Sequence, residues 1–507
     1  MSASNPAPVG AGAGSRWTVA LLGLLLVAAA AVRSQGLGDP LVSFHPLRHY
    51  RSALIARSCY YEATPSTPAW AVAIARANRD IQQAAEPPLM EWLACAAYRI
   101  GGRENLIIPK ALSIVWWCAG AIAVFLLARR LVSPDAALVA AALHLFLPYA
   151  IVATRTFQPD SLMAACVLYA VLALVGWHDR PTPRRLVAAA LLTGLALLVK
   201  PMSVFLVMPA AWAIGRARTP RPPLGADRHF WLLLGLALIP AGLYYGSSVA
   251  FGSLARDQFQ TRFVPSLLAS RFFWAGCLKQ AHHVFGWAAL AAVTVPTAAA
   301  EQPLLRRLLR AIWIGYAAFA VAFTYHVPTH DYYHLPFVPM AALAAAAAFD
   351  VVVRRVRLQP RTVLAATAIL CAAIAWRGSR LALPHLHVAN AAAIVADYER
   401  IGQVTGHDGR VVFLDLEYGY PLMYHAEIAG DAWPGVDDLE AERLDGRRMR
   451  PAAQRFDQDY AGMQPRYFVV TDFDSLEAEP ELARLLAASA TAIDETRRHR
   501  VYRFMGR

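Results

Sequence analysis

Long apolar segments recur through the first 376 residues and are separated by short polar stretches. A helix needs about 20 mostly apolar residues to cross the hydrocarbon core of a bilayer. The pattern predicts eleven membrane-spanning helices: Trp17–Val32, Leu106–Leu127, Ala136–Ala153, Leu162–Trp177, Leu186–Val199, Met202–Ile214, Phe230–Tyr245, His283–Ala299, Ala311–Tyr325, Leu335–Val353 and Val363–Trp376. The fifth and sixth are short and could form one broken hairpin. The first could also be a signal peptide, but the many spans that follow favour an uncleaved helix.

The pattern changes after the last of these spans. Two apolar runs are typical of buried strands, and the segments around them have the spacing of helices. The predicted elements are a helix over Ala391–Ile401, strands over Arg410–Leu416 and Arg466–Phe473, a helix over Leu476–Ala488 and a final edge strand over His499–Phe504. This alternation predicts a small soluble α/β domain. No glycine-rich phosphate loop follows either of the first two strands, which argues against a nucleotide site there.

The fold class expected from these patterns is a mainly α-helical, polytopic membrane protein with a small α/β domain. Residues 1–16 are expected to form a disordered cytoplasmic tail. Residues 17–376 form the transmembrane domain, with a long first external loop over residues 33–105. Residues 377–507 form the extracytoplasmic domain.

The amino-acid composition is also typical of a membrane protein. Of 507 residues, 57% are hydrophobic and only 16% are charged, whereas average soluble domains carry about 25% charged residues. These values exclude a disordered chain, a collagen-like fibre and an ordinary cytosolic enzyme. The formal net charge is +13, which in a soluble protein would suggest a nucleic-acid partner.

The distribution of charge along the chain argues against a nucleic-acid partner. The last 131 residues hold 16 Arg and 21 acidic residues, a net charge of −5, so the first 376 residues carry +18. With the N-terminus in the cytoplasm, the cytoplasmic loops hold 17 Arg, whereas the short outer loops hold only Arg155 and Lys200. Because Lys and Arg collect in cytoplasmic loops, the excess indicates orientation and not nucleic-acid binding. An odd number of spans then places the C-terminal domain and the loops 33–105 and 246–282 outside.

Three of the six cysteines, Cys59, Cys95 and Cys277, fall on the predicted outer side. A disulfide is permitted in such a compartment, but the sequence does not decide whether one forms. The other three lie in predicted spans, where cysteine behaves as a small core residue. No cysteine pair has the spacing of a metal site.

The first external loop contains RHYRSALIAR over Arg48–Arg57, which has the spacing of an amphipathic helix lying at the membrane interface. Arg48 and Arg51 are either surface residues with snorkelling side chains or ligands of a lipid phosphate, since the guanidinium fork suits phosphate oxygens. Glu86 precedes two prolines. It could be a base, an acceptor for sugar hydroxyls, a metal ligand, or simply an acidic residue at a helix start.

Three further polar residues lie in the short outer loops. Asp160 begins a predicted span, where an N-cap is the ordinary role, but together with Arg155 it is also a candidate site member. Lys200 is either a snorkelling anchor at the membrane edge or a phosphate contact. Both interpretations stay open at this point.

The last outer loop reads THDYYHLP from Thr329. His330 and His334 are four residues apart, so one helical turn would place both on one face beside Asp331. Imidazole and carboxylate suit zinc, which makes this trio a candidate site for a divalent metal. Tyr332 and Tyr333 are either interfacial aromatic residues or platforms for a sugar or lipid.

These motifs resemble, in their order, those of the GT-C glycosyltransferases that use polyprenyl-phosphate sugars. The nearest branch is the bacterial one related to protein O-mannosyltransferases (glycosyltransferase family 39) and to the lipid A aminoarabinose transferase. The resemblance covers about Trp17–Trp376 and rests on Arg48–Arg57, Glu86–Pro88, Arg155–Asp160, Lys200–Pro201 and HDYYHLP at His330. The family usually has an acidic residue, often an Asp-Glu pair, just after the first span and a few residues before the Ala-rich interfacial helix. This chain has Arg48-His49-Tyr50 there, and its nearest acidic residue, Asp39, lies further upstream.

The resemblance implies a bacterial inner-membrane enzyme that transfers a sugar, with inversion, from a polyprenyl-phosphate donor to an extracytoplasmic protein, lipid or glycan. Asp39 is the first choice for the base, with His49 or Glu86 as substitutes, and Glu86 and Asp160 would orient sugar or acceptor. Arg48, Arg51, Arg155 and Lys200 would stabilise the leaving phosphate, with Tyr332 and Tyr333 beside the donor.

Two other classes of function remain open. A polytopic transporter or lipid flippase would fit the spans, although the chain shows no obvious internal repeat of the kind transporters often have. A catalytically inactive partner in envelope assembly would fit the missing acidic pair.

Overall fold

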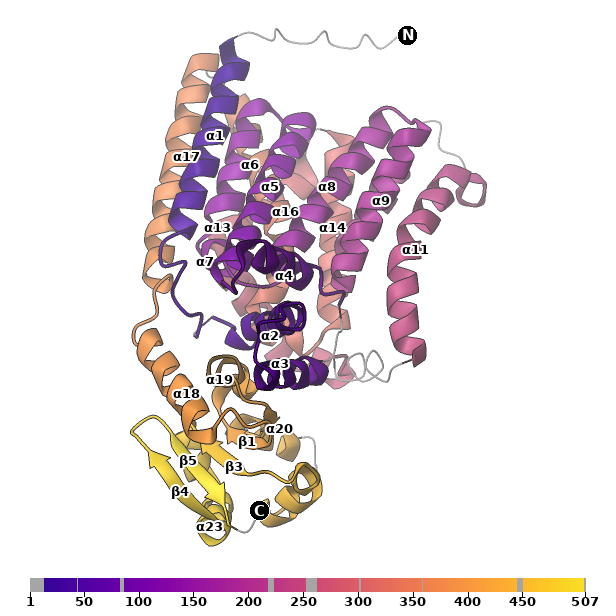
Figure 1. Ribbon diagram of the computed structural model, residues 1–507. Helices are drawn as coiled ribbons and strands as arrows, with labels where there is room; N and C mark the ends of the chain where they lie inside the picture. The colour runs from indigo at the N-terminus through magenta and orange to yellow at the C-terminus, as the bar shows by residue number, and fades with distance from the viewer. Residues whose placement is uncertain are drawn as a thin grey trace.

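A computed structural model describes residues 13–42, 44–82, 86–217, 223–251, 262–300, 302–357, 359–444 and 450–505. Long helices run side by side in a bundle, a layer of shorter helices lies across one end of it, and a small α/β domain lies beyond that layer (Figure 1). The expected tail over residues 1–16 falls mostly outside the described residues.

A helix stands at each of the eleven predicted spans. The bundle comprises α1 (Ala13–Arg33), α5 (Ile107–Leu131), α6 (Pro134–Phe146), α7 (Pro148–Ala153), α8 (Asp160–Asp179), α9 (Pro183–Val199), α10 (Val204–Gly215), α11 (Arg228–Phe251), α13 (Arg271–Ala299), α14 (Pro303–Ala322), α16 (Val338–Val356) and α17 (Pro360–Ala382). Among the described residues, six helices are long and apolar enough to cross a membrane. The prediction of a mainly helical, polytopic membrane protein is confirmed, and the number of eleven crossings stays a prediction.

Local sequence explains where the bundle helices break. The third predicted span is two helices, because Pro148 begins α7 directly after the extended residue Leu147. Glycine allows close helix packing elsewhere. A Cβ atom at Gly378 of α17 would lie 1.8 Å from the carbonyl oxygen of Phe146 in α6, and only glycine tolerates that approach.

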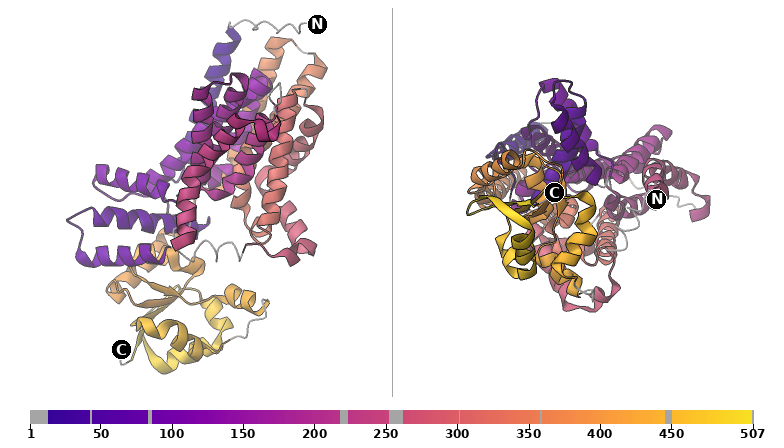
Figure 2. Two further views of the ribbon diagram at one scale, coloured as in Figure 1. Left: turned by 90° about the vertical axis from the view of Figure 1, so that its right-hand side faces the viewer. Right: turned by 60° about the horizontal axis from the view of Figure 1, so that its bottom comes forward.

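The layer at the end of the bundle consists of α2 (Pro46–Glu62), α3 (Ala69–Ile81) and α4 (Leu89–Gly101), which lie roughly across the bundle helices (Figure 2). The predicted helix over Arg48–Arg57 is thus part of α2. It does not lie open at a surface, because α3, α4 and α19 (Tyr420–Ala426) of the C-terminal domain all pack against it. Tyr50, Leu54 and Ala56 are fully buried in this packing.

A disulfide joins α2 to α4. It links Cys59 to Cys95, whose Cα atoms are 6.0 Å apart, while Cys277 is a free thiol. Two of the three cysteines predicted on the outer side are therefore paired, and a bond of this kind persists in an oxidising compartment.

Removing this bond tests its contribution to stability. Because the bond closes a loop with a sequence separation of 36, Cys59→Ser with Cys95→Ser is expected to lower the free energy of unfolding by about 3–4 kcal/mol. Thermal unfolding of the double variant in detergent measures the loss. Cys277→Ser is the matched control, and an equal loss in that variant would contradict the assignment.

The C-terminal domain holds a five-stranded sheet in the order β2-β1-β3-β5-β4. The strands are β1 (Val411–Leu414), β2 (Gly430–Ala432), β3 (Tyr467–Val470), β4 (Ala490–Glu495) and β5 (Arg500–Phe504). β1 is parallel to β2 and β3, whereas β5 is antiparallel to β3 and β4. The helices include α18 (Ala391–Thr405), α20 (Val436–Leu444), α22 (Phe473–Ala478) and α23 (Pro480–Ser489).

The α/β prediction is confirmed, with two corrections. The strand predicted over His499–Phe504 exists, but β5 lies between β3 and β4 and is not at an edge. The edge strand β4 is mostly exposed, and its sequence ATAIDE lacks the continuous apolar run that indicated β1 and β3. The single helix predicted over Leu476–Ala488 is two helices, because Glu479 precedes a proline and leaves the helical conformation.

Candidate active site

Lys200 and Asp160 form a buried ion pair at the end of the bundle nearest α2. Pro201 disfavours a helical conformation for Lys200, which is extended and ends α9. The Lys200 Nζ lies 2.9 and 3.1 Å from the two carboxylate oxygens of Asp160, the first residue of α8. Both side chains are 4% exposed. Asp160 is therefore the partner of a buried cation and more than an acidic residue at a helix start.

Tyr332 connects this pair to the interfacial layer. The Lys200 Nζ is 6.0 Å from the centroid of the Tyr332 ring, and the Arg48 Cζ of α2 is 5.5 Å from the same centroid. Both distances suit a cation over an aromatic face. Two cations from distant parts of the sequence thus flank one buried ring.

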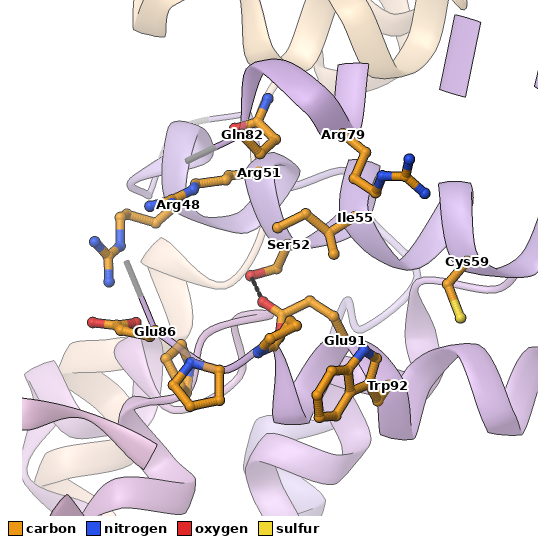
Figure 3. Close-up of a pocket in the computed structure, with 13 residues that line it drawn as sticks. Arg48, Arg51, Ser52, Ile55, Cys59, Arg79, Gln82, Glu86, Glu91 and Trp92 are labelled. Atoms are coloured by element: carbon orange, nitrogen blue, oxygen red, sulfur yellow. Dashed lines mark hydrogen bonds between the residues drawn. The ribbon is translucent and has the colours of Figure 1, made fainter. Parts of the chain in front are cut away.

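Arg48 also lines a cavity of about 250 Å³ between α2 and the segment before α4. Figure 3 shows Arg48 and Glu86 facing each other at one end of this cavity. Burial alone would lower the pKa of Arg48, but Tyr332, Glu86 and Asp160 raise it above its usual value. The guanidinium is therefore held as a cation beside two carboxylates. The other polar side chains of the cavity are Arg51, Ser52, Arg79, Gln82 and Glu91.

Glu91, in the first turn of α4, is a further acidic residue of the cavity. It is buried in α4, and the Ser52 hydroxyl donates a hydrogen bond of 2.6 Å to its carboxylate. Burial raises the pKa of Glu91. Arg51 lies beside it, and burial and the charge of Arg48 lower the pKa of Arg51, against the opposing effect of Glu86. The arginines of α2 therefore lie on one side of the cavity, and Glu86 and Glu91 lie on the other (Figure 3).

Arg155 has a different role from the one predicted. Its guanidinium donates two hydrogen bonds of 2.6 Å to the carbonyl oxygens of Gln35 and Gly36, in the segment after α1. Lys110, which the sequence did not mark, donates from Nζ to the carbonyl oxygens of Leu37 (3.0 Å) and Asp39 (2.8 Å). Both cations hold this segment against the bundle.

Asp39 is also apart from the Arg48 cavity. Its carboxylate lies 2.8 Å from Nδ1 of His387, and both side chains line a separate cavity of about 460 Å³ at the start of the C-terminal domain. The structure thus brings together Arg48, Arg51 and Glu86, with Lys200 and Asp160 close by. It does not bring Asp39 to them.

His49 is enclosed in the protein interior. Its Nδ1 accepts a hydrogen bond of 3.0 Å from the Phe157 backbone N–H, and burial lowers its pKa well below the usual value. A neutral imidazole that accepts at Nδ1 carries its proton on Nε2. Its only acceptor atom is occupied, which suits a positioning contact between α2 and the loop after α7.

The candidate metal trio is not assembled. Residues 331–337 form a 3-10 helix, η4, with His330 extended before it. Because a 3-10 helix has three residues per turn, residues four apart differ by about 120° and do not share a face. His334 is directed into the bundle, bonded to Tyr316 and to the Val327 carbonyl oxygen. No three His, Cys, Asp or Glu side chains in the described ranges are arranged to hold a metal ion.

The Asp331 carboxylate instead contacts a histidine, His45, for which no sequence pattern indicated a role. The carboxylate is 2.7 Å from Nε2 of His45, the residue before α2. The Tyr333 ring stacks on Phe319 of α14 at 5.8 Å between centroids and lies 4.8 Å from the Tyr332 ring. Only tertiary packing joins His45 to Asp331, so no spacing in the sequence could have indicated it.

Known proteins resemble this chain in part of its sequence and in its fold. The family described as dolichyl-phosphate-mannose-protein mannosyltransferase matches residues 85–245, a stretch that includes Glu86, Asp160 and Lys200. No curated protein matches the chain in sequence.

Solved structures match over more of the chain. ArnT from Cupriavidus metallidurans bound to undecaprenyl phosphate has a TM-score of 0.62 and 16% identity, over 97% of this chain and 99% of that one. Its apo state has a TM-score of 0.61 and 16% identity, over 97% and 98%. The Archaeoglobus fulgidus oligosaccharyltransferase in complex with Zn and sulfate has a TM-score of 0.53 and 14% identity, over 89% and 68%. The chain therefore has the GT-C fold of these membrane glycosyltransferases, as its motifs predicted, and its residues 85–245 match a glycosyltransferase family.

Proposed function

We propose that the chain is a membrane glycosyltransferase that transfers a sugar from a polyprenyl-phosphate donor to an acceptor outside the cytoplasm. One observation carries the proposal: the cationic groups of Arg48 and Lys200 both lie near the Tyr332 ring, beside the cavity that Glu86 lines. Fixed cations at the end of a membrane bundle suit a phosphate whose lipid tail stays in the bilayer. The complex of ArnT with undecaprenyl phosphate supports this class of lipid carrier.

The proposed reaction is a single displacement. The acceptor attacks C1 of the sugar, the bond from C1 to the phosphate oxygen breaks, and its electron pair stays on the lipid phosphate. Arg48 and Lys200 stabilise the charge that develops there, and such preorganised electrostatic stabilisation is often the largest catalytic contribution. Asp160 keeps Lys200 in place, and Glu86 would accept hydrogen bonds from sugar hydroxyls. One displacement inverts the anomeric carbon and needs no protein nucleophile.

The proposal includes a location. The 17 Arg in the loops on the side of the N-terminus favour a cytoplasmic N-terminus. Helices α2, α3 and α4, which line the cavity, and the C-terminal domain lie at the opposite end of the bundle from the start of α1 (Figure 1). We therefore place them on the periplasmic face of a bacterial inner membrane, where the Cys59–Cys95 disulfide would be stable.

The test uses the purified full chain in nanodiscs. The donors are undecaprenyl phosphate carrying mannose, galactose, arabinose or aminoarabinose, each is supplied with a protein, a lipid and a glycan acceptor, and release of undecaprenyl phosphate is measured. Release with at least one donor is expected. If none is turned over but labelled donor crosses the bilayer of chain-containing vesicles, the transporter alternative is correct and the proposal is wrong.

Arg48→Ala tests the phosphate contact. The variant loses a charge-assisted hydrogen bond worth about 1.5–3 kcal/mol, so its affinity for undecaprenyl phosphate is expected to fall about 10- to 100-fold. Binding is measured by titration of the lipid into nanodiscs. Arg228→Ala, at the far end of the bundle on α11, is the control that keeps wild-type affinity. Equal affinities in both variants would remove Arg48 from the site.

A further inference from the structure

His45 and Asp331 form a hydrogen-bonded pair next to the proposed phosphate site. His45 precedes Arg48 by three residues at the start of α2, and Asp331 directly precedes Tyr332. The His45 ring meets the Tyr332 ring edge-on, with 4.9 Å between centroids. The pair therefore contacts the same aromatic ring that Arg48 and Lys200 flank.

The Asp331 carboxylate is fixed from several sides. Oδ1 lies 2.7 Å from His45 Nε2 and accepts a hydrogen bond of 2.9 Å from the Tyr149 hydroxyl of α7. Oδ2 lies 3.6 Å from Nε2 of His283 on α13. The Asp331 side chain is 19% exposed and that of His45 is 28% exposed. The carboxylate is thus an orienting group, and the imidazole keeps access to the surroundings.

The hydrogen bond between His45 and Asp331 determines which ring nitrogen of His45 can accept a proton. When Nε2–H donates to Asp331, Nδ1 keeps its lone pair. In the part of the chain that the structure describes, Nδ1 has no hydrogen-bond partner. The His45 backbone lies in the left-handed region (φ 44°, ψ 53°), which is sparsely populated for residues with a side chain. Such conformations often occur where a functional side chain must be held in one direction.

We propose that His45, oriented by Asp331, is the general base of the transfer reaction, an inference that rests on the proposed function. As the acceptor oxygen or nitrogen bonds to C1, its proton passes to Nδ1 of His45. The bond from C1 to the phosphate oxygen breaks at the same time and its electron pair stays on the phosphate. The imidazolium then releases the proton to water. A base oriented by a third group is a common catalytic arrangement. His45 lies three residues before Arg48.

The test compares His45→Asn with Asp331→Asn and Asp331→Glu in the full chain in nanodiscs, using the sugar-loaded undecaprenyl phosphates named above. Asparagine tolerates the left-handed backbone, so His45→Asn removes the imidazole without forcing α2 to rearrange. Turnover of His45→Asn is expected to fall about 100-fold or more, while its affinity for undecaprenyl phosphate stays within about twofold of wild type. His229→Asn on α11, an exposed residue, is the matched control.

The pH profile separates a base from a structural residue. Wild-type turnover should rise with pH while the base loses its proton, and His45→Asn should lose that rise. Asp331→Asn should lower turnover and shift the rise, and Asp331→Glu should restore part of the rate. The titratable and charged groups around His45 are Arg48, Tyr149, His283, His330, Asp331 and Tyr332.

Two results overturn the inference and one overturns the proposed function. Wild-type turnover and an unchanged pH profile in His45→Asn would remove His45 as the base. A loss confined to Asp39→Asn would assign the base to Asp39. Lack of lipid phosphate release by the wild-type chain with every donor would instead contradict glycosyl transfer itself, whatever the variants do.

Discussion

In Lys200→Met, turnover is expected to fall about 1000-fold, because the variant removes a fixed cation from the developing phosphate charge. Its stability is expected to fall as well. Asp160 is then left buried without its partner, and breaking a buried pair in this way costs about 3–5 kcal/mol. Both effects arise from one side chain that is 4% exposed and within 2.9 Å of a carboxylate.

A double variant separates the two effects. In Lys200→Met with Asp160→Leu, no buried charge is left unpaired, and apolar replacements of buried pairs are often neutral or stabilising. The melting temperature should therefore recover toward the wild-type value while turnover stays low. Thermal unfolding in detergent and release of undecaprenyl phosphate measure the two quantities. Recovery of turnover together with stability would mean that the pair only supports the fold.

The prediction from sequence succeeded where a local pattern determines the structure. Each of the eleven predicted spans is helical in the structure, because a continuous apolar segment in a bilayer must satisfy its backbone hydrogen bonds within itself. Lys200 and Asp160, both candidate site members, lie together in the structure, and their role in a site stays a prediction. Their pairing could not be predicted, since 40 residues separate them and only the packing of α8 against α9 and α10 brings them together.

The prediction failed where a role depends on tertiary contacts. Asp39 was the first choice for the base as the nearest acidic residue to the position that the resemblance indicates, but the structure pairs it with His387 in another cavity. His45 precedes a proline, and no pattern in the sequence indicated a role for it. The spacing of His330 and His334 suggested one helix face, but that argument assumed α-helical geometry, and the segment is a 3-10 helix. Local spacing therefore indicated which end of the bundle carries the polar candidate residues, while their partners could be seen only in the fold.

Arg57 shows how the same helix that carries Arg48 is tied to the C-terminal domain. Its Nε lies 2.9 Å from a Glu104 carboxylate oxygen, and its Cζ lies 3.6 Å from the centroid of the Tyr424 ring on α19. It also donates to the Tyr424 carbonyl oxygen, and the Tyr424 hydroxyl donates to Glu104 at 2.6 Å. Burial alone would lower the pKa of Arg57, but Glu104 and Tyr424 raise it above its usual value. One cation thus joins α2, the segment after α4 and α19.

In Arg57→Met, the free energy of unfolding is expected to fall by about 3–5 kcal/mol, because Glu104 keeps its buried charge without its cationic partner. The C-terminal domain should also lose contact with α2, which limited proteolysis detects as faster cleavage between the bundle and residues 391–505. Arg76→Met on α3 is the control, since the side chain of Arg76 is 56% exposed and 3.8 Å from Glu62, and exposed pairs contribute about 0–1 kcal/mol.

The effect of Arg57→Met on transfer distinguishes two roles of the C-terminal domain. α2 carries His45 and Arg48 at one end and Arg57 toward the other, so a displaced domain should let α2 shift and raise the KM for the donor. The pH profile should stay that of the wild type, because the His45–Asp331 pair does not involve Arg57. If cleavage becomes faster while KM is unchanged, the domain covers the bundle without positioning α2. Wild-type stability and wild-type cleavage together would contradict the assigned role of Arg57.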